Sequence, residues 1–180
     1  ASRKMSSLRS FFRFLVREGL VKGNPFAGLQ QPKARRRLPV VLSREEVVRL
    51  IEAPSRVREQ ARKQEEPRHK SFADYAALRD TAILELLYST GMRIAELCGL
   101  TDVRLDLLSG TALVRGKGKK ERLCPIGRPA GEALQAALEA RDRLTVVRGR
   151  SRAQALFMNK NGGPLTPRSA KACGRNCTAM

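Results

Sequence analysis

The stretch from Ser71 to Gly91 most constrains the fold, because it carries the strongest helical pattern in the chain. Ser71-x-x-Asp74 has the spacing of a helix start, and a glycine ends the run. The apolar residues at helical spacing between them are Tyr75, Ala76, Ala82, Ile83, Leu86 and Leu87. The sequence therefore predicts a long helix with one buried face, and Tyr75 is expected in the core on that face.

Two elements of different kinds follow this helix. Residues 93–98 predict a short helix that begins at Arg93. Residues 111–115 and 120–125 predict two strands, and Gly116-Lys-Gly-Lys joins them as a tight turn, so together they predict a β-hairpin. This order predicts an α+β fold that is mostly α-helical, with one small antiparallel β-sheet.

Three further segments carry helix signals. Ser43-x-x-Glu46 is a capping box that opens a helix, and Pro54 is expected to end it. Residues 55–70 are polar enough to predict a solvated loop or a frayed helix, whereas residues 130–144 predict a helix rich in Ala and Leu. Thr166-Pro167 suits a helix start, but the periodicity is then lost, so no helix is expected to develop after it.

A basic linker separates the N-terminal part of the chain from the rest. Residues 3–18 predict an amphipathic helix that ends at Gly19. Residues 30–39 then predict an extended linker with a proline near each end. Four cations lie between the prolines: Lys33, Arg35, Arg36 and Arg37. We therefore expect a domain boundary here, with residues 1–32 before a linker at 33–41.

The charge balance points to a polyanionic partner. The chain has 36 lysines and arginines against 17 aspartates and glutamates, a net charge of +19. Its hydrophobic share of 42% is enough for a core, which excludes a disordered basic tail. Neutralised phosphates release condensed counterions, so nucleic acid is favoured. The basic first helix could instead lie on an anionic membrane, but the α+β pattern of the rest favours nucleic acid.

The cysteines do not suggest a metal site. Cys98 and Cys124 lie in apolar segments and are expected to be small buried residues of a cytoplasmic protein. Cys173-x-x-x-Cys177 has the spacing of half a metal site, but the only histidine, His69, lies in a charged stretch expected to be a loop. We therefore expect no metal.

Arg93 has two interpretations that its own segment leaves open. Glu96 lies three residues further on, so the two side chains could simply pair on the short helix. Alternatively, the guanidinium and the backbone N–H groups at the start of the helix could converge on one point, which would make a good phosphate site.

Lys117 is equally open when it is considered alone. Lysines at the tip of a hairpin are usually solvated, and the glycines beside them supply the positive φ that a tight turn needs. Flanking glycines would also let the backbone and Lys117 approach a nucleic acid closely. The combination of Arg93 and Lys117 is more specific than either residue.

Two segments together carry a family resemblance. The first is Leu86-Leu-Tyr-Ser-Thr-Gly-Met-Arg-Ile-Ala-Glu-Leu-Cys-Gly-Leu-Thr101, and the second is Val114-Arg-Gly-Lys-Gly-Lys-Lys-Glu-Arg-Leu-Cys-Pro-Ile-Gly127. They resemble the catalytic domain of the tyrosine recombinases, the phage integrase family, in its bacterial Xer-like branch. Arg93 matches the first catalytic arginine of the family, and Lys117 matches its hairpin lysine. The resemblance runs from about residue 2 to about residue 168.

The resemblance implies a role for each of these residues. Arg93 would hold the scissile phosphate, and Lys117 would protonate the 5′ leaving oxygen. The family completes its site with a His-x-x-Arg box, a His or Trp and a nucleophilic Tyr, none of which this sequence contains. Its only tyrosines, Tyr75 and Tyr88, precede Arg93. Covalent catalysis conserves the phosphodiester energy, so no cofactor is expected.

The resemblance also implies a domain assignment. Residues 1–32 would be the end of a helical, SAM-like core-binding domain, residues 42–168 the N-terminal half of the catalytic domain, and residues 169–180 an aberrant tail. The expected function is site-specific DNA recombination, as in Xer-like chromosome dimer resolution or integration, from a truncated chain without its nucleophile. Whether such a chain is an enzyme stays open. The alternatives are a non-catalytic DNA-binding fragment and a structural nucleoprotein unrelated to recombinases.

The expected partners are double-stranded DNA and, for a longer form, other recombinase subunits in a tetrameric synapse. No membrane partner is expected. The residues expected to contact DNA are Lys33, Arg35, Arg36, Arg37, Arg115, Lys119, Lys120 and Arg122.

Overall fold

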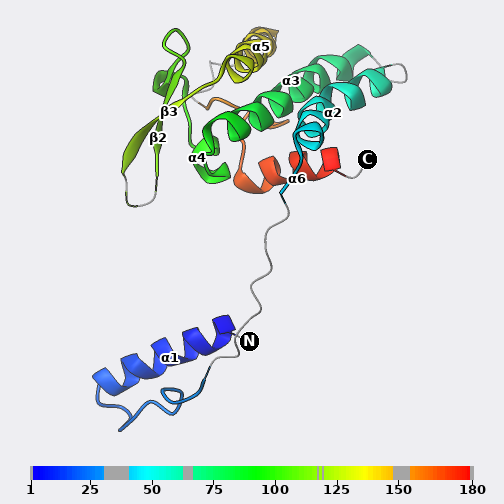
Figure 1. The fold of residues 1–180 in the computed structure, drawn as a ribbon. Coiled ribbons are helices and arrows are strands. Elements are labelled where there is room, and N and C mark those ends of the chain that lie inside the picture. The colour runs from blue at the N-terminus through cyan, green and yellow to red at the C-terminus, as the bar shows by residue number, and fades with distance from the viewer. Residues whose placement is uncertain are drawn as a thin grey trace. The chain divides into compact units, whose positions relative to one another are not determined.

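The chain divides into two compact units, residues 1–41 and residues 42–180 (Figure 1). The computed structural model describes residues 2–30, 41–62, 67–116, 118, 120–147 and 155–178. The four cations of the expected linker, Lys33, Arg35, Arg36 and Arg37, lie outside the described residues.

The N-terminal unit consists of helix α1 (Ser2–Arg17) and a segment that folds back onto it. The helix ends before Gly19, which has a positive φ of 71°. The Arg9 guanidinium donates to the carbonyl of Phe26 at 2.9 Å, and the rings of Phe12 and Phe26 lie 5.1 Å apart. Several apolar side chains of α1 remain exposed: Leu8, Phe11, Phe14 and Val16.

The larger unit is mostly helical. Its elements are α2 (Arg44–Arg62), α3 (Pro67–Thr90), α4 (Ile94–Cys98), the 3-10 helix η1 (Asp102–Arg104), β1 (Leu105–Asp106), β2 (Thr111–Arg115), β3 (Glu121–Pro125), α5 (Arg128–Val147) and α6 (Pro167–Thr178). The strands form one antiparallel sheet in the order β1-β2-β3. Helix α3 runs through the middle of the unit and contacts α5, α2 and α6 (Figure 1). The α+β prediction is confirmed.

One apolar core lies where α3, α4, the sheet and α5 meet. Its fully buried members include Leu86, Leu97, Val114, Leu134 and Leu156. Each such side chain contributes roughly 1.5–3 kcal/mol by leaving water. Tyr75 is 1% exposed and packs in a second, smaller cluster with Leu144 and Met158, which confirms its expected place in the core.

The sequence predicted that helix α2 ends at Pro54, and this prediction is wrong. The proline lies inside the helix and is buried, and the helix runs on to Arg62. Contacts with α3 hold the polar turns beyond the proline, because Arg58 donates to Asp74 at 2.6 Å and Arg62 lies 3.8 Å from the same carboxylate. A further correction concerns His69, which belongs to helix α3 and not to a loop.

The hairpin lies where the sequence predicted it. Strands β2 and β3 pair in antiparallel register, with Val114 opposite Arg122 and Leu113 opposite Leu123. Gly118 has a φ of 76°, so the turn uses a conformation that favours glycine. Strand β1 was not predicted, because it is only two residues long and too short to show a strand pattern.

Helix α6 corrects the expectation that no helix develops after Pro167. The helix begins where Thr166-Pro167 predicted a start, and the Thr166 hydroxyl accepts a hydrogen bond from the backbone N–H of Ser169 at 3.2 Å. Ala170 is 3% exposed and belongs to the main core, so packing against the rest of the unit stabilises this helix although it has no large apolar residue.

Two buried arginines hold the segment that leads to α6. Arg141 is 1% exposed, forms a bidentate pair with Asp102 at 2.8 Å for both contacts, and donates to the carbonyls of Ala155 and Leu156. Arg79 donates to the carbonyl of Met158 at 2.8 Å. These contacts satisfy backbone groups that would otherwise be buried without partners.

Candidate functional site

Arg93 lies in the sharp break between α3 and α4. The break begins at Gly91, whose φ of 60° turns the chain out of α3, and the buried side chain of Met92 then anchors it in the core. The backbone of Arg93 is extended, with φ −74° and ψ 148°. Its side chain is 73% exposed, so most of the guanidinium faces solvent.

Glu96 is the centre of the hydrogen bonding around Arg93. Its carboxylate accepts the backbone N–H of Arg93 at 2.9 Å and the Nη1 of the same residue at 3.0 Å. It also accepts both terminal nitrogens of Arg122, at 2.8 Å and 3.3 Å. The side chain of Glu96 is only 6% exposed. The structure therefore contains the Arg93–Glu96 pair that the three-residue spacing allowed.

The two arginines keep Glu96 ionised. Hydrogen bonds from the Arg122 side chain, followed by the backbone N–H of Arg93, lower the pKa of Glu96 from 4.5 to about 2. The carboxylate is therefore fully charged near neutral pH, and it orients the two guanidinium groups that contact it.

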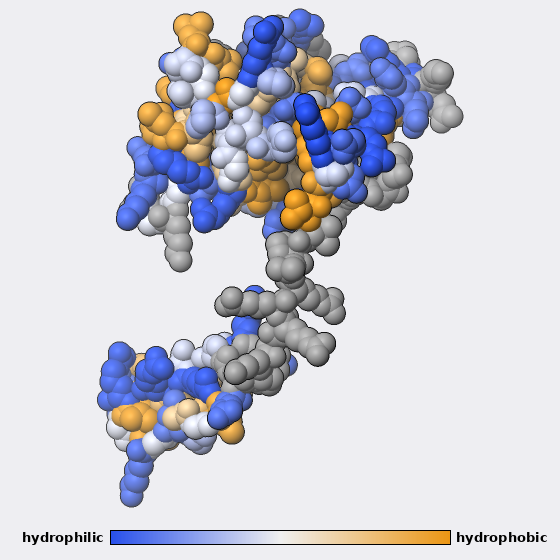
Figure 2. Space-filling view, viewed as in Figure 1, coloured by the Kyte–Doolittle hydropathy of each residue, from blue (hydrophilic) through white to orange (hydrophobic). Residues whose placement is uncertain are grey.

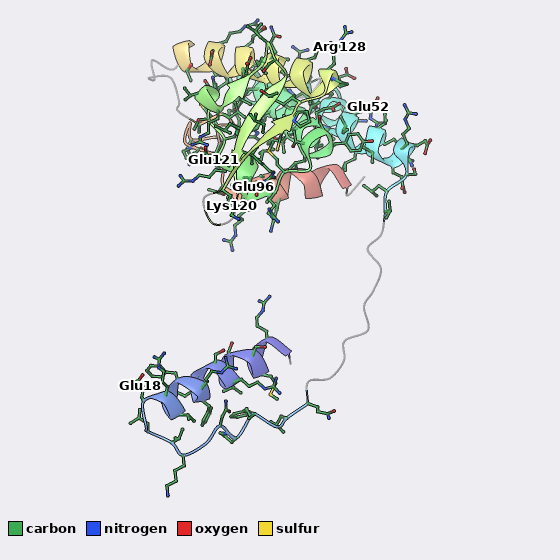
Figure 3. The ribbon with its side chains drawn as sticks, turned by 60° about the vertical axis from the view of Figure 1, so that its left-hand side comes forward. Glu18, Glu52, Glu96, Lys120, Glu121 and Arg128 are labelled. Atoms are coloured by element: carbon green, nitrogen blue, oxygen red, sulfur yellow. The ribbon has the colours of Figure 1, made fainter. Side chains whose placement is uncertain are left out.

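The base of the hairpin closes against this cluster. The N–H of Gly116 donates to the carbonyl of Lys120 at 2.7 Å. A Cβ at Gly116 would lie 3.2 Å from Nη1 of Arg122 and 3.4 Å from Oε1 of Glu96, so a larger residue would require the Arg122 side chain to shift slightly. Figure 3 shows Glu96, Lys120 and Glu121 at the same end of the sheet.

The predicted site residues fall into three groups. Arg93 and Arg122 meet on Glu96. Arg115 and Lys120 are exposed on the hairpin, where hydrophilic side chains gather in Figure 2. The placement of the others lies outside the described residues: Lys117, Lys119, Lys33, Arg35, Arg36 and Arg37.

Sequence reasoning missed the partner of Arg122. The signal was present in the strand alternation, since residues 122 and 124 share one face of β3, and Cys124 is 4% exposed on that face. A cation on the face of a strand that packs against a helix favours an acidic partner on that helix. Glu96 meets that requirement from 26 residues earlier in the chain.

No tyrosine follows Arg93 in the sequence. Tyr75 is buried, and its hydroxyl accepts the backbone N–H of Met158 at 2.8 Å. Burial raises the pKa of this hydroxyl. Tyr88, in contrast, is 66% exposed near the end of α3.

Metal ligands and membrane spans can be assessed in the part of the chain that the structure describes. That part contains no group of three or more His, Cys, Asp or Glu residues placed to hold a metal ion. None of its helices is both long enough and apolar enough to cross a lipid bilayer. Cys124 is buried as expected, whereas Cys98 is half-buried.

Known proteins resemble the chain in sequence. The tyrosine recombinase XerC of Bacillus licheniformis is 39% identical over 94% of the chain, and that of Bacillus pumilus is 42% identical over 94%. In both comparisons the chain covers 51% of the relative, so it spans about half the length of these curated relatives.

Solved structures share its fold. XerA recombinase matches 79% of the chain with a TM-score of 0.58 at 24% identity, and the match covers 43% of that protein. A lambda integrase tetramer bound to a Holliday junction matches 97% of the chain with a TM-score of 0.61 at 18% identity, and 45% of that protein is covered.

The family match covers most of the larger unit. Residues 40–177 match the phage integrase family. The match continues past residue 168, where the sequence had suggested that the resemblance ends, and it includes helix α6 up to residue 177. The chain therefore belongs to the phage integrase family, and relatives about 40% identical to it carry the name tyrosine recombinase XerC.

Proposed function

We propose that this chain supplies the first half of the phosphate-binding site of a site-specific DNA recombinase. Arg93 holds the scissile phosphate, and Lys117 on the hairpin protonates the 5′ leaving oxygen. The parent reaction cuts and rejoins DNA through a 3′-phosphotyrosyl intermediate, in chromosome dimer resolution or integration.

One observation carries this proposal. The Glu96 carboxylate binds Arg93, and it would lie 3.4 Å from a Cβ placed at Gly116. Lys117 follows Gly116 by a single peptide bond, and consecutive Cα atoms are about 3.8 Å apart. Gly116 at the base of the hairpin is therefore close to the element that carries Arg93. A guanidinium that is 73% exposed beside the base of a lysine-rich hairpin suits one phosphate shared between two cations.

The remaining parts of the reaction require residues that this sequence does not contain. A nucleophilic tyrosine, a His-x-x-Arg box and a further His or Trp would have to come from another polypeptide segment. Double-stranded DNA is the substrate, and further recombinase subunits in a tetramer are the partners, in the cytoplasm. The residues that contact DNA phosphates include Arg115, Lys119 and Lys120 on the hairpin and the four cations of the linker.

The test compares cleavage with binding. The chain is joined within α6 to the C-terminal part of the XerC relative from Bacillus pumilus, which supplies a nucleophile. Arg93→Ala and Lys117→Ala should reduce single-turnover cleavage at least about a hundredfold while leaving DNA affinity nearly unchanged. One contact among many contributes little to affinity, but it contributes much more where charge develops in the transition state.

Lys119→Ala and Lys120→Ala are the matched controls, because they remove the same charge from the same turn. If Lys117→Ala behaves like these controls in both assays, the hairpin is a solvated basic turn. The alternative function is then favoured, in which the +19 chain binds DNA phosphates without taking part in chemistry.

A further inference from the structure

Arg122 lies on the face of the edge strand β3 that is turned toward α4, although its side chain remains 41% exposed. It pairs in register with Val114, which is fully buried, and it shares its face with Cys124. The next residue, Leu123, points to the opposite face and is 69% exposed. Strand alternation therefore directs the Arg122 guanidinium toward α4 and not toward the outer face of the hairpin.

The guanidinium engages Glu96 with both of its terminal nitrogens. Nη2 contacts Oε2 at 2.8 Å, and Nη1 contacts Oε1 at 3.3 Å. Each of these oxygens also accepts one donor from Arg93, the backbone N–H on Oε2 and Nη1 on Oε1. Since one carboxylate serves both arginines, the direction of the Arg93 side chain depends on how firmly Arg122 holds Glu96.

The same pair also fixes the base of the hairpin. Gly116 has little space for a side chain, because a Cβ would lie 3.2 Å from Arg122 and 3.4 Å from Glu96. The backbone of residue 116 is thus packed directly on the Arg122–Glu96 pair. A movement of that pair would shift both the Arg93 loop and the hairpin.

We propose that Arg122 is a positioning residue. Through Glu96 it fixes Arg93 and the hairpin base relative to each other, and its own charge is paired with the Glu96 carboxylate. This inference rests on the proposed function, and it assigns Arg122 a different role from the phosphate contact expected from the sequence. A lysine cannot replace it, because a single ammonium group does not bridge two carboxylate oxygens with fixed geometry.

The test uses the whole chain and three variants, Arg122→Lys, Arg122→Met and Arg104→Met. Arg104 is the matched control. Its Nη1 pairs at 2.8 Å with Glu121, which lies beside Arg122 on β3, and the pair does not involve Glu96. Hydrogen–deuterium exchange is followed in residues 91–98 and 111–125. Both Arg122 variants should speed exchange in both segments by about tenfold, whereas Arg104→Met should leave residues 91–98 unchanged.

The second measurement is the salt dependence of duplex DNA binding. A positioning residue leaves the slope of log K against log salt unchanged, whereas a phosphate contact lowers its magnitude by about 0.9 when it is removed. The inference is overturned if Arg122→Met lowers the slope in this way. It is also overturned if Arg122→Lys exchanges like the unchanged chain, or if Arg104→Met loosens both segments equally.

The two proposals fail in different ways. If the unchanged chain binds DNA without salt dependence, the proposed function is wrong, and the exchange experiment still decides whether Arg122 couples the two segments. If DNA binding is salt-dependent but exchange is insensitive to Arg122, only the positioning role is wrong.

Discussion

Glu96 connects three parts of the site through one side chain. It accepts hydrogen bonds from Arg93 and Arg122 and lies against Gly116. The sequence could identify Arg93 and its neighbour Glu96, because they are three residues apart on one predicted helix. It could not identify the link to Arg122, because 26 residues and a change from helix to strand separate the partners. In a chain with 36 lysines and arginines, charge alone does not single out one arginine.

The ionisation of the single residue Glu96 predicts how the stability of the chain depends on pH. Its pKa in the folded chain is about 2, below the ordinary value of 4.5 that applies when the chain unfolds. The stabilisation is therefore complete above pH 4.5 and is lost as the pH falls toward 2. Glu96→Gln should lower the melting temperature at about pH 7, and the difference from the unchanged chain should shrink below pH 4.5. Thermal melts of both proteins from about pH 7 to about pH 3 measure this difference in melting temperature.

Glu132→Gln is the control for this experiment, because Glu132 also pairs with an arginine but its side chain is 66% exposed. It should have little effect at any pH, since exposed pairs contribute about 0–1 kcal/mol. A difference for Glu96→Gln that stays constant down to about pH 3 would show that the carboxylate is not held by its arginines.

Arg141 gives a second prediction, about stability. Its side chain is 1% exposed, and its removal would leave Asp102 and two backbone carbonyls without this partner. Arg141→Met should lower the free energy of unfolding by about 3 kcal/mol, measured by urea denaturation. The control is Arg143→Met on the same helix, whose side chain is 81% exposed and whose removal should cost less than about 1 kcal/mol. Equal effects would contradict a special role for the buried arginine.

Some helices and strands could be predicted from local sequence pattern, whereas others depend on tertiary contacts. Helix α3 and the hairpin were predictable, because their apolar spacing and glycine turns are properties of short stretches of sequence. Helix α6 and the second half of α2 were not, since their stability comes from contacts made by Ala170 and Arg58 with distant elements. Strand β1 exists only because β2 lies beside it.

Helix α6 gives a prediction about how a single element contributes to stability. Ala170→Asp would place a charge in the main core and should lower the free energy of unfolding by about 2–4 kcal/mol. Lys171→Asp, one position further along the same helix, should change it by less than about 0.5 kcal/mol. If both substitutions have the same small effect in chemical denaturation, α6 does not belong to the cooperative unit.

For the whole molecule, the absence of a tyrosine after Arg93 determines what chemistry to expect. Tyr75 is buried and hydrogen-bonded to the backbone, and Tyr88 lies on α3 before Arg93. Neither is expected to attack the phosphate in line, which such chemistry requires. A nicked suicide substrate should therefore trap no covalent protein–DNA complex with this chain. A trapped complex that disappears in Tyr88→Phe would mean that Tyr88 is a nucleophile.

The division into two units gives the last prediction. Every buried apolar residue among those described lies within residues 42–180, whereas residues 1–41 carry ten of the 36 lysines and arginines. Residues 42–180 alone should therefore keep a cooperative melting transition but bind DNA more weakly. The magnitude of the salt slope should fall by about 0.9 for each phosphate that the N-terminal unit and linker neutralise in the whole chain. Anisotropy titrations of both chains between about 50 and 200 mM salt measure this. An unchanged slope would place all the phosphate contacts in the larger unit, on its hairpin and helices.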